Sequence, residues 1–100
     1  MCGIAGIYSS TVQTSEKEFQ LALHTLKKRG PNAEGIYAFA KGFLGHTRLS
    51  IIDTSDAANQ PMLNETEDYV IVFNGEIFNF QELKKTKLHS FSIPFKTNSD

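Results

Sequence analysis

The sequence predicts one small domain of the α+β class, and three observations lead to that prediction. Short runs of aromatic and β-branched residues at 35–40 and 43–52, punctuated by glycine, favour adjacent strands joined by a tight turn. Between residues 15 and 29 the apolar residues recur at helical spacing instead. The dipeptide Asn74-Gly75 separates two further apolar runs, which is typical of a hairpin with a type I′ turn. Strands joined by such tight turns pair in the antiparallel direction.

The first third of the chain predicts a strand followed by a helix. Residues 2–8 mix small and apolar residues without helical spacing, which indicates a buried strand. Ser15 and Glu18 form a capping box, the signature of a helix start. Gly30-Pro31 ends the helical pattern, so the helix is expected to run as far as residue 29.

The second half of the chain is less regular. Residues 53–67 are rich in Asp, Asn, Ser and Thr and predict a loop. Asn79, with Glu82 three residues later, predicts a short helix through Lys85. In the tail, Pro94 would confine any strand to the edge of a sheet.

Composition limits the partners of the chain. Ten basic and eleven acidic residues give a net charge of −1, so no large positive field is available to attract nucleic acid or an anionic membrane. No apolar run approaches the roughly 18 residues that cross a bilayer, and the start of the chain lacks the features of a signal peptide, so a cytoplasmic location is expected. Cys2 and the three histidines, at 24, 46 and 89, lack the short spacing of metal ligands, so no metal site is expected.

Cys2, the only cysteine, lies directly behind the initiator methionine. Removal of Met1 would leave a thiol and a free α-amine on the same residue. Near neutral pH a fraction of such amines is unprotonated and can accept a thiol proton, so one residue could supply both nucleophile and base. The alternative is that position 2 holds a small residue without a chemical role.

Two further features have both a catalytic and a structural interpretation. The Asn74 amide and the Gly75 N–H could stabilise an oxyanion, or the pair could form a plain hairpin turn. Arg48 could bind a carboxylate through two parallel hydrogen bonds, or it could form a structural ion pair with Asp53 or another acid. Similarly, Arg29 with Gly30-Pro31 could be no more than a helix stop.

Six segments, in order, carry a resemblance that covers almost the whole chain. They are MCGIAGIY, RGPNAEG, HTRLSIID, QPM, FNGEIFNFQEL and FKTNSD. In this ordered set the chain resembles the N-terminal part of class II glutamine amidotransferases, which are N-terminal-nucleophile hydrolases, and within them the glutamine-hydrolysing asparagine synthetase group. The resemblance implies a four-layer αββα sandwich, of which residues 1–100 would form a single domain, incomplete at its C-terminal side and without the synthetase domain.

The resemblance also implies a role for individual residues. After loss of Met1, Cys2 would attack the side-chain amide of glutamine with its own α-amine as base, and Asn74 and Gly75 would form the oxyanion hole. Arg48 would bind the α-carboxylate of glutamine, while Glu76 and Asp100 would face its α-ammonium. The implied glutamine-binding set is Arg48, Leu49, Ser50, Ile51, Ile52, Asn74, Gly75, Glu76 and Asp100.

The implied partners follow from the same group of enzymes. Glutamine hydrolysis would need no cofactor, whereas ATP and Mg²⁺ would be used only with the synthetase domain. The ammonia would pass to an acceptor, with aspartate favoured by motif similarity, and the chain could form an oligomer. Asn32 replaces the aspartate common in this family's R-G-P-D motif, which keeps the hydrogen-bonding shape of the turn but removes a charge. The alternative function is a truncated, non-catalytic module that binds glutamine or another protein.

Overall fold

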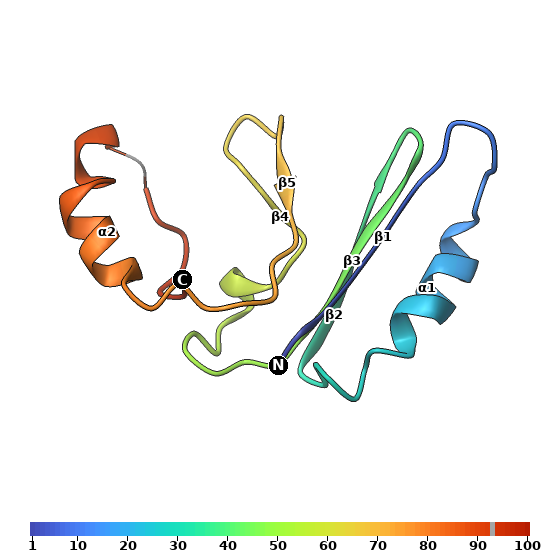
Figure 1. Cartoon of the computed structure of the whole chain (residues 1–100), viewed down its shortest axis with the longest axis horizontal. Helices are drawn as coiled ribbons and strands as arrows, with labels where there is room; N and C mark the ends of the chain where they lie inside the picture. The colour runs from blue at the N-terminus through green and yellow to red at the C-terminus, as the bar shows by residue number, and fades with distance from the viewer. Residues whose placement is uncertain (93) are drawn as a thin grey trace.

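The computed structural model describes residues 1–92 and 94–100, and it confirms the predicted α+β class with antiparallel sheets (Figure 1). Its elements, in chain order, are β1 (Gly3–Tyr8), α1 (Glu16–His24), β2 (Ala33–Phe39), β3 (Gly42–Arg48), the 3₁₀ helix η1 (Asp56–Ala58), β4 (Met62–Leu63), β5 (Val70–Ile71), α2 (Phe80–Thr86) and the 3₁₀ helix η2 (His89–Phe91). Along the long axis of the molecule, α1 lies outside a three-stranded sheet, the β4–β5 pair follows, and α2 lies at the far end (Figure 1). Within the described residues, no helix is long and apolar enough to span a membrane.

The three-stranded sheet has the order β1-β3-β2, and both strand pairs are antiparallel. The predicted strand at 2–8 is confirmed as β1, and β2 with β3 forms the predicted tight-turn pair. The prediction that the last of these strands reaches residue 52 is wrong, because β3 ends at Arg48. The partner strands reach no further than Thr47 and Arg48 in register, so residues 49–52 have no strand to pair with.

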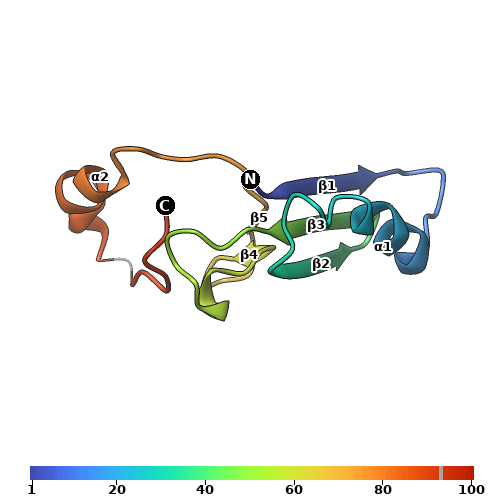
Figure 2. The same cartoon turned by 90° about the horizontal axis from the view of Figure 1, so that it is seen from below.

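Helix α1 covers one face of this sheet, as Figure 2 shows from below. The capping box is confirmed: the Glu18 N–H donates to Ser15 Oγ at 3.2 Å and the Ser15 N–H donates to Glu18 Oε2 at 2.8 Å. Phe19 and Leu23 are buried, and a Cβ added at Gly45 of β3 would lie 2.8 Å from Leu23 Cδ2. The missing side chain at Gly45 therefore lets the apolar face of the helix approach the sheet closely.

The prediction that this helix reaches residue 29 is wrong. The regular helix ends at His24, and the N–H groups of Leu26, Lys27 and Arg29 then bond to carbonyls three residues back. Such bonds are typical of 3₁₀-type turns, so the chain stays tightly wound after the α-helix has ended. The chain is thereby redirected toward β2 before Gly30 is reached.

The hairpin predicted at Asn74-Gly75 is also wrong. Strand β5 ends at Ile71, and it pairs with the preceding strand β4, inside the predicted loop, rather than with a following strand. The turn of this hairpin lies between Asn64 and Tyr69 and includes Glu67 at φ 60°. No described glycine has a positive φ, whereas a type I′ turn requires one at both central positions.

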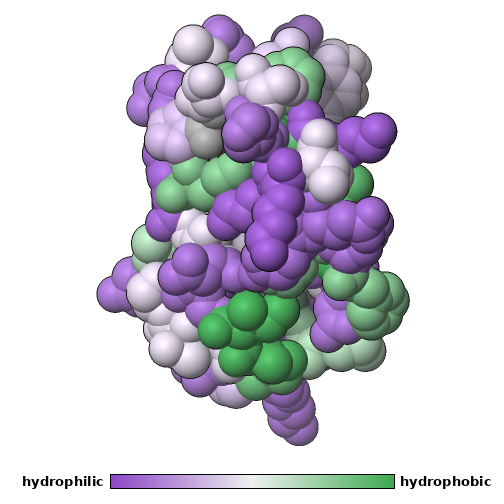
Figure 3. Space-filling model, turned by 90° about the vertical axis from the view of Figure 1, so that its left-hand side faces the viewer, coloured by the Kyte–Doolittle hydropathy of each residue, from purple (hydrophilic) through white to green (hydrophobic). Residues whose placement is uncertain are grey.

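Helix α2 confirms the short helix predicted after Asn79, although the Asn79 side chain does not cap it. It buries none of its residues, and the Lys84 ammonium lies 4.2 Å from the centre of the Phe95 ring. The surface on this side of the molecule is mostly hydrophilic with a compact hydrophobic patch (Figure 3). In the tail, residues 94–100 form no strand, and Ile93 lies outside the described residues.

Candidate active site

A cleft of about 730 Å³ brings together nearly all the residues that the sequence predicted for the site. Its lining comes from both ends of the chain and from the loops that follow β3 and β5. The predicted residues that line it are Cys2, Arg48, Leu49, Ile51, Ile52, Asn74, Gly75, Glu76 and Asp100. Ser50 is the exception, since it does not line the cleft.

Cys2 lies immediately before β1 and is half-buried at the cleft. The Leu49 N–H donates to Cys2 Sγ at 3.3 Å, and Arg29 Nε donates to the Cys2 carbonyl at 3.2 Å. Both contacts hold the residue without using its α-nitrogen. Met1 is 73% exposed, so the bond that would have to be cut to free this nitrogen lies at an accessible end of the chain.

Arg48, at the end of β3, is buried and held by three oxygen acceptors. Its Nη1 donates to the Ser55 carbonyl at 2.7 Å and to Asn59 Oδ1 at 2.8 Å, and its Nη2 donates to the Asp53 carbonyl. The ion pair considered with Asp53 is wrong, because within the described residues Arg48 contacts the backbone oxygen of Asp53 and no carboxylate. A guanidinium has five N–H donors, so two remain for another acceptor.

The Asp53 carboxylate instead joins the loop after β3 to the tail of the chain. Its Oδ1 accepts the Ser55 hydroxyl at 2.6 Å and the Ser55 N–H at 2.8 Å, while its Oδ2 accepts the Asn98 N–H at 2.9 Å. These bonds lower the pKa of Asp53 from 3.8 to about 2, and the bond from the Ser55 hydroxyl has the largest effect. The carboxylate is therefore charged at neutral pH and keeps residues 97–100 beside the cleft.

Asn74, Gly75 and Glu76 lie on the exposed segment that follows β5. Asp100 is tied to this segment, because its Oδ2 accepts the Ile77 N–H at 2.6 Å and its Oδ1 accepts the Ser99 hydroxyl at 3.2 Å. The two predicted carboxylates, of Glu76 and Asp100, thus line one cleft with the Asn74 amide and the buried guanidinium. The Asp53 carboxylate and the Gln60 amide line it as well. This set of charges is complementary to a small zwitterion that carries an amide.

The segment around Asn32 supports the loop that follows β3. Asn32 Oδ1 accepts the Ser50 N–H at 2.9 Å, and the Asn32 N–H donates to the Arg48 carbonyl at 2.9 Å. Gly30 is buried, and Pro31 forms a parallel bridge with Arg48. The segment is therefore more than a helix stop, and Ser50 acts in this support rather than in the wall of the cleft.

Among the lining residues that the sequence prediction missed are His46, Gln60 and Phe73. His46 lies within β3 and is almost completely buried. Burial lowers its pKa below the ordinary value. A histidine within a predicted strand was the only signal for it, and nothing in the local sequence linked it to residues 60 and 73.

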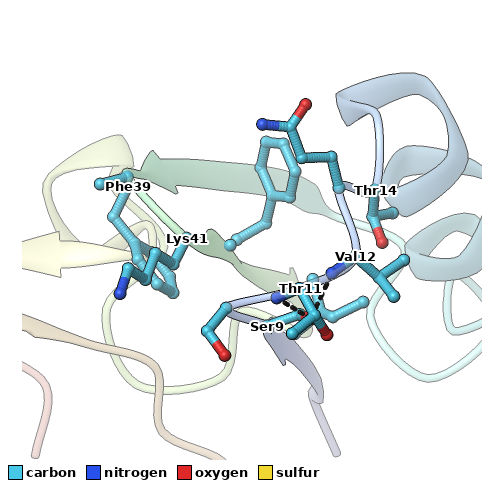
Figure 4. Close-up of a pocket in the computed structure, with 12 residues that line it drawn as sticks. Ser9, Thr11, Val12, Thr14, Phe39 and Lys41 are labelled. Atoms are coloured by element: carbon cyan, nitrogen blue, oxygen red, sulfur yellow. Dashed lines mark hydrogen bonds between the residues drawn. The ribbon is translucent and has the colours of Figure 1, made fainter.

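A second cavity, of about 520 Å³, lies at the opposite end of the sheet, between the β1–α1 loop and the β2–β3 turn (Figure 4). Its most structured feature is Ser9, whose Oγ accepts the N–H groups of Thr11 and Val12. These bonds stabilise the loop itself, and none of the predicted site residues lies there. Among residues 1–92 and 94–100, no group of three or more His, Cys, Asp or Glu side chains could hold a metal ion.

The sequence was compared with protein families and with curated proteins. Residues 1–100 match the family model described as "Glutamine amidotransferase domain". All of the chain aligns with 18% of a probable glutamine-hydrolysing asparagine synthetase of Dictyostelium discoideum at 38% identity, and with 18% of asparagine synthetase B of Escherichia coli at 36% identity. It also aligns along its whole length with 22% of a putative asparagine synthetase of Methanocaldococcus jannaschii at 36% identity. The chain thus spans about a fifth of the length of these curated relatives.

Proposed function

The chain belongs to the glutamine amidotransferase domain family, and from that premise we propose that it releases ammonia from glutamine in the cleft beside Cys2. One observation carries the proposal: Cys2, Arg48, Asn74, Gly75 and the two carboxylates line the same cleft although they are far apart in the sequence. The names of the relatives, all glutamine-hydrolysing asparagine synthetases, support the same reaction.

In the proposed reaction, Cys2 acts after Met1 has been removed. The free α-amine takes the thiol proton, and the sulfur attacks the carbonyl carbon of the glutamine amide. The Asn74 amide and the Gly75 N–H donate to the oxyanion of the tetrahedral intermediate. The C–N bond then breaks, the protonated amine supplies a proton, and ammonia leaves behind a thioester. Water attacks this thioester, the C–S bond breaks, and glutamate and the free thiol are released.

The charged residues would orient the substrate. The two remaining N–H donors of Arg48 would bind the α-carboxylate, and Glu76 with Asp100 would attract the α-ammonium. Leu49, Ile51 and Ile52 would line the wall beside the aliphatic part of glutamine. Ser50 would contribute only through its bond to Asn32.

We further propose that residues 1–100 are one part of a larger glutaminase domain with the four-layer αββα architecture. The succession of α1, the two sheets and α2 along the molecule supports this proposal (Figure 1). A synthetase domain would then use the ammonia, with aspartate as the acceptor, and ATP and Mg²⁺ would act there. The glutaminase reaction proposed above uses only groups of the chain itself and water.

Glutamate release by the processed chain, with Cys2→Ala as the control, tests the proposed reaction. We expect release from the wild-type chain and none from the variant, and hydroxylamine should trap the thioester as a hydroxamate. Asn74→Ala should lower kcat by about 10²–10³-fold, since it removes one oxyanion donor. Asn79→Ala is a matched control, because that side chain caps nothing in α2. Equal rates for the wild-type and Cys2→Ala chains would refute the proposal.

A second candidate function is a non-catalytic binding module, and the exposure of large apolar side chains favours it. Ile51, Tyr69 and Phe78 are 68%, 77% and 91% exposed, which is typical of surfaces that contact another protein. This alternative predicts either glutamine binding without turnover or association with a partner chain. Calorimetry with glutamine, followed by sizing of the free chain, distinguishes it from the glutaminase, since a monomer with full turnover excludes the module.

A further inference from the structure

The backbone of Phe73 is held from both sides by side chains of other elements. Its N–H donates to Gln60 Oε1 at 2.5 Å, and its carbonyl lies 3.2 Å from His46 Nε2. Phe73 lies beyond the end of β5, where no sheet pairing fixes the backbone, and it directly precedes Asn74. The position of Asn74 and Gly75 therefore depends on these two side-chain contacts.

His46 is a rigid anchor for one of the contacts. It lies on the central strand β3, opposite Ile4 of β1 and Gly35 of β2, and is only 1% exposed. Burial and the nearby Arg48 guanidinium both favour the neutral ring over the charged one. In a neutral ring with the proton on Nε2, this nitrogen donates to the Phe73 carbonyl. The buried Nδ1 then carries a lone pair and no proton, and it has no hydrogen-bond partner among the described residues.

Gln60 and the Phe73 ring complete the arrangement. The Gln60 backbone packs closely on β2, because a Cβ added at Gly35 would lie 2.3 Å from the Gln60 carbonyl oxygen. The Phe73 ring packs on Gly75, where an added Cβ would lie 2.9 Å from ring carbon Cζ. Phe73 thus links the rigid three-stranded sheet to both residues of the Asn74-Gly75 pair.

We propose that His46 and Gln60 are positioning residues that hold the Asn74 and Gly75 donors in place for the reaction, through the Phe73 backbone. The inference rests on the proposed glutaminase function, in which these two donors meet the oxyanion. Oxyanion donors act only when they are preorganised, and a displacement of about 1 Å can reduce a rate by about 10²-fold. The charged groups expected to bind the α-carboxylate and α-ammonium of glutamine, on Arg48, Glu76 and Asp100, take part in neither contact.

The test compares Gln60→Met, which keeps the length of the side chain but removes the acceptor, with Gln60→Glu, which retains an acceptor oxygen. In the processed chain we expect Gln60→Met to lower kcat by about 10–100-fold with KM nearly unchanged, and Gln60→Glu to restore most of kcat. Alkylation of Cys2 by iodoacetamide should proceed at the same rate in all three chains, because it needs no oxyanion donor. Gln20→Met, at an exposed position of α1, is the matched control. A general loss of structure would instead change KM and the alkylation rate as well.

Amide hydrogen exchange at Asn74 and Gly75 tests the inference independently of turnover. Exchange should be faster in Gln60→Met than in the wild-type and Gln60→Glu chains. If the wild-type chain hydrolyses no glutamine, the proposed function fails, and the exchange rates alone decide whether the Gln60 side chain positions this segment. Equal exchange rates in all chains, or a Gln60→Met variant with unchanged kcat, would overturn the inference.

Discussion

The substitution Arg48→Lys tests how much of the cleft depends on one buried side chain. The guanidinium of Arg48 uses two nitrogens to reach three acceptors, on Asp53, Ser55 and Asn59. A lysine keeps the charge but places its donors on a single nitrogen, so it cannot reach all three. Hydrogen bonds to charged groups contribute about 1.5–3 kcal/mol each, and the loss of one or two gives a range of about 2–6 kcal/mol. Because Ser55 is exposed and water can replace part of its contact, we expect a loss of about 2–3 kcal/mol.

Urea unfolding followed by circular dichroism measures this loss as a lower midpoint with an unchanged slope. Arg29→Lys is the matched control, since the exposed Arg29 side chain donates one hydrogen bond, to the Cys2 carbonyl. The free energy of unfolding of this variant should differ from that of the wild type by no more than about 0.5 kcal/mol. In the glutaminase assay, Arg48→Lys should also raise KM, because a lysine cannot bind a carboxylate through two parallel hydrogen bonds. An Arg48→Lys chain that unfolds at the same urea concentration as the wild type would refute the assignment of Arg48 as an anchor of this loop.

Three other predictions concern the packing, the cap and the pH dependence. Leu23→Ala should lower the free energy of unfolding by about 2–5 kcal/mol, because the Leu23 side chain is fully buried. Leu21 is 65% exposed on the same helix, so Leu21→Ala should change this free energy little. Equal urea midpoints for the two variants would contradict the prediction. Ser15→Ala should cost about 1 kcal/mol through loss of the capping box, read from the same unfolding curves. The folded pKa of Asp53 is about 2 and its ordinary value is 3.8. The stabilisation of the folded state by this carboxylate is therefore complete at pH values above 3.8 and is lost as the pH falls toward 2. Acid unfolding followed by circular dichroism should therefore lose this pH dependence in Asp53→Asn, and an unchanged titration would contradict it.

Local signals in the sequence predicted the starts of elements well. Ser15 and Glu18 form the expected reciprocal cap, and the strand behind Cys2 and the helix behind Asn79 both lie where expected. These features depend on neighbouring residues, so short-range patterns suffice to find them. The assignment of the site came from the ordered motifs of a family, because no periodicity relates position 2 to position 48 or 100.

The ends of elements and the partners of polar side chains were predicted poorly, since both depend on distant residues. β3 ends at Arg48 because its neighbours end, not because the residues up to 52 disfavour a strand. The segment around Asn74-Gly75 is no hairpin turn because β5 pairs with β4 behind it. Arg48 prefers carbonyl and amide oxygens to the Asp53 carboxylate, which is already bonded to Ser55 and Asn98. Such competition between partners becomes visible only in three dimensions.

Residues 2 and 100 line one cleft, and this has a consequence for the order in which the chain matures. Contacts between residues so distant in sequence require closure of a long loop, so they form later than the β2–β3 pair or the first turn of α1. A half-folded copy would then hold the Cys2 sulfur beside Leu49 while the Asp100 carboxylate is not yet bonded to Ile77. Under the proposed function, such a copy would begin to hydrolyse glutamine only after residues 97–100 have docked beside the cleft.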